Sequence, residues 1–328
     1  MKPLEGHVAL VAGATRGAGR GIARMLGEAG AVVYCSGRSS RAQPNTTSHH
    51  YAGRPETIEE TAEMVTAAGG VGIPVRVDHL VFDEVDALFA RVRRERGRLD
   101  VLVNDISEGE RHDWEPFWKV SLDKGFRALR QGLHSHIVTS RAAAPLMIEG
   151  RRGLIVEVGD GDTLDYRGTL FFDLVKVTVS RLAYAMAEEL RRHGVAAVAV
   201  TPGFLRSEMM LEHFGVTEAN WRDGAKKDPN FIASETPCFV GRAIAALAAD
   251  PRVIEKSGGL YSSWRLAREY GFTDLDGTQP DIGAQIDFEA QYARSANTPF
   301  RWTVAPRAPS AAAPPRRVSA ARGRRRRA

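Results

Sequence analysis

Apolar residues in this chain gather in short runs that alternate with segments of helical periodicity. The runs are mostly continuous, which is typical of strands buried on both faces of a parallel sheet. They predict seven strands, over residues 7–13, 31–37, 72–78, 99–105, 153–160, 194–203 and 258–263. Apolar spacings of three and four predict helices between them, over 15–30, 56–70, 82–97, a long region ending near 149, 169–190 and 236–250.

The alternation of strands and helices predicts an α/β fold, a Rossmann-type doubly wound parallel sheet of about seven strands. We expect residues 38–55 to form a polar loop and 204–235 an irregular segment. Residues 1–263 then make one domain, and 264–300 a C-terminal extension packed on it. Residues 301–328 are rich in Arg, Pro and Ala and predict a disordered tail.

The formal net charge of +5 comes from this tail, which holds nine arginines and no acidic residue. The other 300 residues carry 36 basic and 40 acidic side chains, so the body is mildly acidic. Because no aromatic residues interleave with the tail arginines, we expect no specific nucleic-acid function. No apolar run approaches the ~20 residues of a membrane span, and none near the start resembles a leader. These features predict a cytoplasmic protein without a membrane contact.

The residues that commonly bind metals are sparse. Cys35 and Cys238 are the two cysteines of the chain, and we expect both to be buried or partly buried thiols. His49 and His50 adjoin each other in the polar loop, but no acidic or cysteine partner stands at ligand spacing. We therefore expect no metal site.

A glycine-rich turn joins the first predicted strand to the first helix, with the spacing G-x-x-x-G-x-G. Glycines at such a turn let backbone N–H groups approach a pyrophosphate, and the helix N-terminus faces the phosphates with its positive dipole end. The position of the turn, at the start of an alternating α/β chain, indicates a dinucleotide site. Its candidate contacts are Gly13, Thr15, Arg16, Gly17, Ala18 and Gly19.

The second predicted strand ends in Ser36-Gly37-Arg38, about 20 residues after the turn. A carboxylate there would bind the ribose 2′-hydroxyl of NAD, but this chain has none. Arg38 and Arg16 suit a 2′-phosphate instead, since guanidinium groups form forked, charge-assisted hydrogen bonds with phosphate. The sequence therefore favours NADP(H) over NAD(H), with two solvated arginines as the alternative.

Together these motifs resemble the short-chain dehydrogenase/reductase family over roughly residues 5–263. The three glycines match the family's T-G-x-x-x-G-x-G, with Ala12 in place of the threonine. The resemblance implies that Asp78 lies beside the adenine and that Asn104 opens the family's N-N-A-G motif. It further implies cofactor contacts from Pro202, Gly203 and Ser207. The segments 78–82 and 266–274 resemble the branch near dehydrogenase/reductase member 1.

The family's catalytic group is Asn-Ser-Tyr-Lys, and little of it is found here. In the family a tyrosine hydroxyl gives or takes the proton while a hydride moves between nicotinamide and a carbonyl or alcohol carbon. The tyrosine position holds Phe172, four residues before the retained Lys176. The serine position falls on Gly159, followed by Asp160, and the asparagine position on Arg130.

Three hypotheses follow from this loss. An active oxidoreductase would need a substitute donor, for which Asp160, Tyr166 or water are candidates; a strand-end carboxylate and a surface tyrosine are the plainer interpretations. A non-catalytic NADP(H)-binding protein would act in regulation or as an oligomer partner. A weakly functional variant of an active lineage is the third. We favour an oxidoreductase by descent with impaired or altered catalysis, because positioned acid–base groups supply about 10²–10⁴-fold in rate.

The resemblance implies a small carbonyl or alcohol compound as the substrate, but the sequence does not identify which one. Residues 204–236 resemble the family's mobile substrate lid. In that segment Met209, Met210, Phe214 and Trp221 are candidates for an apolar pocket or for ordinary packing. Because family members commonly pair through their long helices, the resemblance also implies a homodimer or homotetramer.

Overall fold

Seven parallel strands form the single sheet of the described chain. The computed structural model describes residues 2–44, 51–111 and 113–285. The strands are β1 (Val8–Ala12), β2 (Val32–Gly37), β3 (Val71–Arg76), β4 (Val101–Asn104), β5 (Gly153–Val158), β6 (Val195–Thr201) and β7 (Leu260–Ser262). Their order across the sheet is β3-β2-β1-β4-β5-β6-β7, and every pairing is parallel. The predicted doubly wound sheet is therefore confirmed.

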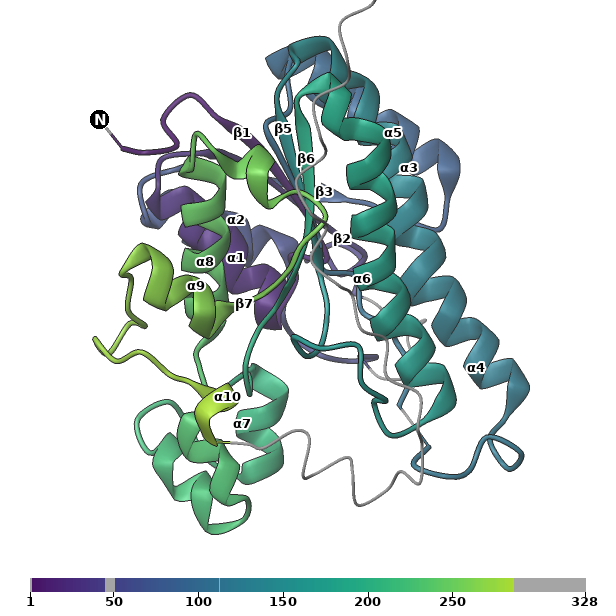
Figure 1. Ribbon diagram of the computed structural model, residues 1–328, viewed down its shortest axis with the longest axis vertical. Coiled ribbons are helices and arrows are strands. Elements are labelled where there is room, and N and C mark those ends of the chain that lie inside the picture. The colour runs from purple at the N-terminus through teal and green to yellow at the C-terminus, as the bar shows by residue number, and fades with distance from the viewer. Residues whose placement is uncertain (1, 45–50, 112, 286–328) are drawn as a thin grey trace, which may run out of the picture. The chain divides into compact units, whose positions relative to one another are not determined.

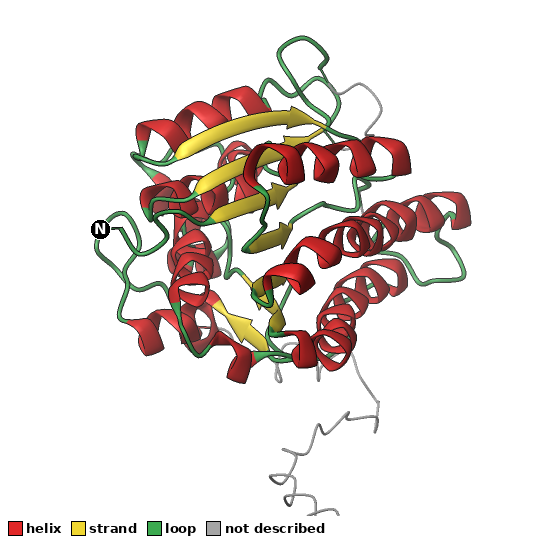
Figure 2. Cartoon of the chain, turned by 90° about the horizontal axis from the view of Figure 1, so that it is seen from above, coloured by secondary structure: helices red, strands yellow, loops and turns green. Residues whose placement is uncertain are grey.

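Helices cover both faces of the sheet (Figures 1 and 2). On one face lie α1 (Gly17–Glu28), α2 (Ile58–Ala67) and α8 (Pro237–Ala249), which pack on one apolar core cluster. On the other lie α3 (Phe82–Arg96), α5 (Ser135–Gly150) and α6 (Leu170–Leu190), around the second cluster. Strands β1, β4, β5 and β6 are fully or almost fully buried, as their continuous apolar runs predict.

The order of the strands reverses between β1 and β4. In open α/β sheets, ligands bind outside the carboxyl ends of the strands at such a switch point. The loops after β1 and β4 both begin there. Their first residues, Gly13 and Asp105, have backbones that lie close together. The fold therefore builds its main cleft where the sequence predicts the dinucleotide site.

The helical region before residue 149 is shorter than predicted. Residues 105–111 and 113–121 form no helix or strand after β4. Helix α4 (Leu122–Leu129) begins only after Pro116 and the cap of Ser121, whose hydroxyl accepts from Lys124 N–H. A π-helical turn over Arg130–His134 then joins α4 to α5. The helical periodicity of the sequence is correct for 122–149, but it does not reveal where the first turn starts.

The segment 204–235 carries more regular structure than its irregular pattern predicts. It contains α7 (Glu208–Phe214) and short 3₁₀ turns at Trp221–Lys226 and Pro229–Ala233. Phe214, Trp221 and Phe231 are buried against one another and form a small core of this segment. Two of its candidate pocket residues thus act in packing.

The chain beyond β7 continues with α9 (Ser263–Tyr270) and α10 (Ile282–Gln285). Leu266 of α9 is fully buried in the same core cluster as α1 and α8. The chain divides into one unit, Met1–Asn297, and a second, Thr298–Ala328, which lies wholly outside the described residues together with the predicted tail. Among the described residues, no helix has both the length and the apolar character to cross a membrane.

Candidate functional site

The glycine turn after β1 has a conformation that requires glycine. Gly13 has a φ of +90°, and a Cβ at this position would lie 2.2 Å from the carbonyl oxygen of Asp105. A Cβ on Gly19 would lie 2.4 Å from the carbonyl oxygen of Gly13. The turn therefore packs directly on the loop after β4. Helix α1 starts at Gly17 with its N-terminus at the cleft, the arrangement that binds phosphate in this type of fold.

The cleft encloses about 370 Å³. Eleven of the thirteen predicted cofactor contacts line it, namely Gly13, Thr15, Arg16, Gly17, Ala18, Arg38, Asp78, Lys176, Pro202, Gly203 and Ser207. Two of the positions discussed for catalysis, Gly159 and Asp160, line it as well. Gly19 and Asn104 lie beneath this lining. The turns after six strands, β1 to β6, thus meet in one site, although they are spread over nearly 200 residues of sequence.

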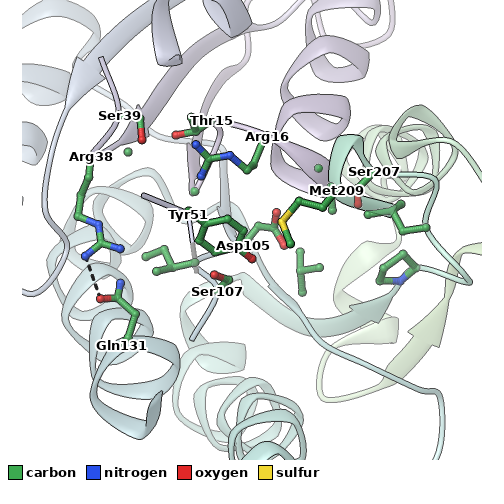
Figure 3. Close-up of a pocket in the computed structure, with 18 of the residues that line it drawn as sticks. Thr15, Arg16, Arg38, Ser39, Tyr51, Asp105, Ser107, Gln131, Ser207 and Met209 are labelled. Carbon is green, nitrogen blue, oxygen red and sulfur yellow. Dashed lines mark hydrogen bonds between the residues drawn. The ribbon is translucent and has the colours of Figure 1, made fainter. Parts of the chain in front are cut away.

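Arg38 stands at one end of this cleft, and Arg16 lies nearer its centre (Figure 3). Arg38 donates to the side-chain oxygen of Gln131 at 3.2 Å. Burial lowers the pKa of Arg38 below its ordinary value, and the positive charges of Arg16 and Arg76 lower it further, while Asp78 acts in the opposite direction. This end of the cleft therefore carries crowded positive charge that an anion would stabilise.

Arg16 has capacity to bind an additional anion. Its Nε donates to Glu56 at 3.1 Å, and both side chains are mostly buried. Its Nη2 is buried and has no hydrogen-bond partner within the described part of the chain. An unpartnered guanidinium nitrogen is costly in such surroundings, so a phosphate that reached it would satisfy a buried donor.

Asn104 takes part in a buried polar network under the cleft. Its amide nitrogen donates to Ser140 at 2.8 Å and to Glu157 at 2.7 Å. Glu157 also contacts His136 Nδ1 at 2.6 Å, and His136 Nε2 lies 2.9 Å from the carbonyl oxygen of Ile106. Burial opposes the charge on His136, but Glu157 outweighs it and raises the pKa of His136. This network fixes the loop after β4 rather than presenting Asn104 to the cleft.

Lys176 reaches the cleft from α6, as the helix spacing predicts. Its Nζ lies 3.2 Å from a carboxylate oxygen of Glu108 and 5.4 Å from the centroid of the Phe172 ring. Burial works against the ammonium, but the carboxylates of Glu108 and Asp160 outweigh it and raise the pKa of Lys176. Lys176 is therefore a fixed positive charge beside the apolar ring of Phe172.

Phe172 and Gly159 stand where the family has hydroxyl-bearing residues, and their surroundings differ. Phe172 does not line the cleft; its ring packs edge-on against Trp114, with centroids 6.1 Å apart. At Gly159, which is buried, a Cβ would meet only Ser180 Oγ at 3.6 Å, an ordinary contact. A serine would therefore fit at 159 without a change of backbone.

Among the proposed substitute donors, Asp160 is exposed and lines the cleft, whereas Tyr166 is 49% exposed and does not line it. Arg130, at the expected asparagine position, is exposed, and its neighbour Gln131 lines the cleft instead. Of the candidate lid residues, Met209 lines the cleft and Met210 packs on the lid core. His49 and His50 lie outside the described residues.

Several residues of the cleft lining were not predicted from the sequence, and the most consequential are Asp105 and Tyr51. Asp105 follows Asn104 at the floor of the cleft, and its carboxylate accepts a hydrogen bond from Gly19 N–H. Burial raises the pKa of Asp105 to about 7, while Lys176, Gly19 N–H and His136 act in the opposite direction. The sequence did offer a signal for Asp105, because it stands where the family has a second asparagine. Tyr51 lies in the middle of the cleft (Figure 3) and comes from a polar loop without any periodic pattern.

Comparison with known proteins agrees with this geometry. The family profile of the short chain dehydrogenases matches residues 7–214. The chain is 37% identical over 284 residues to "Dehydrogenase/reductase SDR family member 1" of Mus musculus, covering 84% of this chain and 86% of that protein. The Homo sapiens protein of the same name is 35% identical over 281 residues, covering 84% and 85%.

A solved structure shares the fold. The crystal structure of a short chain dehydrogenase from Mycobacterium thermoresistibile has a TM-score of 0.69 and 22% sequence identity, and the match covers 85% of this chain and 92% of that one. With the family profile and the two relatives, the evidence extends across most of the chain. The chain therefore belongs to the short-chain dehydrogenase/reductase family of oxidoreductases, near the branch of dehydrogenase/reductase member 1.

Proposed function

We propose that this protein binds NADP(H) in the cleft between β1 and β4 and that its carbonyl or alcohol chemistry is impaired or altered. The observation that carries the cofactor proposal is the buried, unpartnered Nη2 of Arg16 beside the crowded guanidinium of Arg38. A 2′-phosphate would satisfy the first and neutralise the second, whereas NAD(H) has an uncharged hydroxyl at the 2′ position. Membership of the family implies a nicotinamide cofactor, and these arginines support the phosphorylated form.

The residues present fit such a cofactor along the whole cleft. Gly17 lines the cleft with a φ of +55°, and a Cβ there would meet only Ser207 at 3.8 Å, so its backbone is open to the close approach that a pyrophosphate site needs. The N-terminus of α1 would stabilise the phosphates, Asp78 would contact the adenine, and Lys176 would bind the nicotinamide ribose. A bound nicotinamide supplies or accepts the hydride. Ser207 lines the cleft while its hydroxyl also caps α7, accepting from Met210 N–H at 3.3 Å.

The surroundings of Lys176 support impaired catalysis. In an active site of this type, a cationic lysine lowers the pKa of a nearby phenol and stabilises its anion. Here the neighbouring ring is that of Phe172, and the nearest group with opposite charge is Glu108 at 3.2 Å. Lys176 can still hold a ribose, but it has no proton donor at 172 to activate and no hydroxyl at 159 to orient a substrate oxygen.

The alternative is a non-catalytic NADP(H)-binding protein that acts in regulation or as an oligomer partner. The Lys176–Glu108 ion pair favours it, because a carboxylate already neutralises the lysine that catalysis would use. Both hypotheses predict cofactor binding, and they differ in turnover. A homodimer or homotetramer, a small carbonyl or alcohol substrate and a cytoplasmic location remain predictions under the first hypothesis.

Titrations of the purified protein with NADPH and NADH, followed by nicotinamide fluorescence, test the cofactor proposal. We expect NADPH to bind at least about tenfold more tightly, a difference of about 1.4 kcal/mol, which is modest for a charge-assisted contact. Arg38→Ala should remove most of this preference. Arg93→Ala is the matched control, because Arg93 is 49% exposed, pairs with Glu149 and lies outside the cleft lining. Equal affinities for NADPH and NADH in the wild type would refute the preference.

A further inference from the structure

Tyr51 crosses the cleft at its centre. In Figure 3 its ring lies between Arg38 at one end and Ser207 and Met209 at the other. The guanidinium carbon of Arg16 stands 4.9 Å from the ring centroid, and the phenol hydrogen-bonds with Ser107 on the opposite wall. The side chain thus bridges the glycine turn and the loop after β4. A ligand that extended from Arg38 to Ser207 would have to pass through the space of this ring.

The segment that carries Tyr51 is tied down by ion pairs on both sides of the cleft. Arg54 contacts Glu56 at 2.6 Å and Glu212 of α7 at 2.7 Å, and its side chain is 15% exposed. Glu56, only 8% exposed, also accepts from Arg16 at 3.1 Å. One chain of charges therefore connects the glycine turn, the segment 51–56 and the lid helix. These contacts hold Tyr51 in the cleft through protein partners alone.

The remaining volume is small for the cofactor that the site suits. About 370 Å³ lies near the lower end of the ~300–1,000 Å³ that small-molecule sites occupy. A dinucleotide is larger than most such ligands and has to lie along the whole length of the cleft. The closed arrangement therefore has room for part of the cofactor, and the central ring is the element whose removal would join the two ends.

We propose that residues 51–56 form a gate in the dinucleotide cleft and that the Tyr51 ring is the group that the cofactor displaces on binding. This inference rests on the proposed function, since it assumes that a dinucleotide enters here. Its energetic consequence is general: when only a fraction of the molecules is open, the apparent dissociation constant rises by the inverse of that fraction. A gate that is closed about nine-tenths of the time weakens binding about tenfold.

The test compares NADPH affinities of variants by fluorescence titration. Tyr51→Ala removes the ring and should lower the dissociation constant about five- to tenfold. Tyr51→Phe keeps the ring but loses the bond to Ser107, so it should lower the constant only about two- to threefold. Tyr184→Ala is the matched control, because Tyr184 is partly exposed, packs against Arg181 and lies outside the cleft lining. Its affinity should equal that of the wild type.

Weakening the ion pairs of Arg54 should also tighten NADPH binding, without changing the residues that line the cleft. Glu212→Gln removes one of the two carboxylates on Arg54 and should tighten NADPH binding about two- to threefold, since Glu212 is mostly exposed. Glu63→Gln is the control of equal charge; Glu63 pairs with Arg41 on the exposed side of α2. Hydrogen exchange gives a second readout: amides of 51–56 should exchange faster when NADPH is added.

The outcomes separate the gate from the cofactor site itself. Tighter binding by Tyr51→Ala together with faster exchange of 51–56 supports the gate. If the wild type binds NADPH and Tyr51→Ala binds it equally or more weakly, Tyr51 contacts the cofactor and the gate is refuted, while the proposed function stands. If neither protein binds NADPH or NADH at millimolar concentrations, both proposals fall, because the gate predicts that removal of Tyr51 opens the site.

Discussion

We predict that Asp105 makes dinucleotide binding depend on pH near neutrality. Its carboxyl lies at the floor of the cleft and accepts from Gly19 N–H in the first turn of α1, where the phosphates of a dinucleotide would lie. Although the side chain is partly exposed to the cleft, its desolvated position raises its pKa to about 7. The carboxyl is therefore neutral below pH 7 and ionised above it. The ionised form repels phosphate, so affinity should fall as the pH rises.

The size of the effect follows from this pKa. With a pKa of about 7, roughly one-tenth of the carboxyls is ionised at pH 6 and nine-tenths at pH 8. If only the neutral form accepts the cofactor, the dissociation constant rises about tenfold between these two values, or about 1.4 kcal/mol. The positive charge of Lys176 offsets part of the negative charge of the ionised carboxyl, so tenfold is an upper limit.

Calorimetric titration with NADPH at pH 6, 7 and 8 measures this change of the dissociation constant, with Asp105→Asn as the reference. The amide is close in shape and stays neutral, so its affinity should lack the decline. Because a 2′-phosphate itself gains charge near pH 6, the ratio of wild-type to variant constants is the quantity to follow. The wild type should also take up as much as one proton on binding at pH 8. A ratio that is constant from pH 6 to 8 would refute the reasoning.

Two further predictions concern stability. Gly13→Ala should lower the free energy of unfolding by about 2–4 kcal/mol in a denaturant titration, because the Cβ would both clash with Asp105 and strain a φ of +90°. Gly97→Ala has a similar φ of +67° but open space, so its loss should stay near 1 kcal/mol. Burial raises the pKa of Glu235 to about 8, so native Glu235 retains its proton where the unfolded chain has lost it. Stability should then fall as the pH rises from about 4.5 to 8, by up to about 1.4 kcal/mol per pH unit, and Glu235→Gln should remove this slope.

The sheet could be predicted from the sequence because its strands are continuous apolar runs. Each of the seven predicted strands exists, with bounds that differ by a few residues. The glycine turn could be predicted for a similar reason, since a spacing of glycines directly reflects a backbone requirement. Lys176 was placed correctly because helical spacing fixes which residues share a face.

The rest of the site depends on contacts between distant segments, which leave no periodic trace. Tyr51 lies in a polar loop, and only the fold brings it between Arg16 and Ser107. The buried position of Asn104 follows from Glu157 and Ser140, which lie 53 and 36 residues further along the chain. The start of α4 depends on a local cap at Ser121, which a helical pattern alone does not mark.

The central claim is that two lost hydroxyls, at 172 and 159, limit catalysis in a site that still binds its cofactor. The most direct measurement is NADPH oxidation with a panel of ketones and aldehydes, by the wild type and by Phe172→Tyr combined with Gly159→Ser. Position 159 has space for the serine, and Lys176 stands 5.4 Å from the ring at 172. We expect kcat to rise at least about 10²-fold with NADPH affinity nearly unchanged, and Lys176→Met to abolish the gain. A wild type that already matches the double variant on the same substrate would contradict the account.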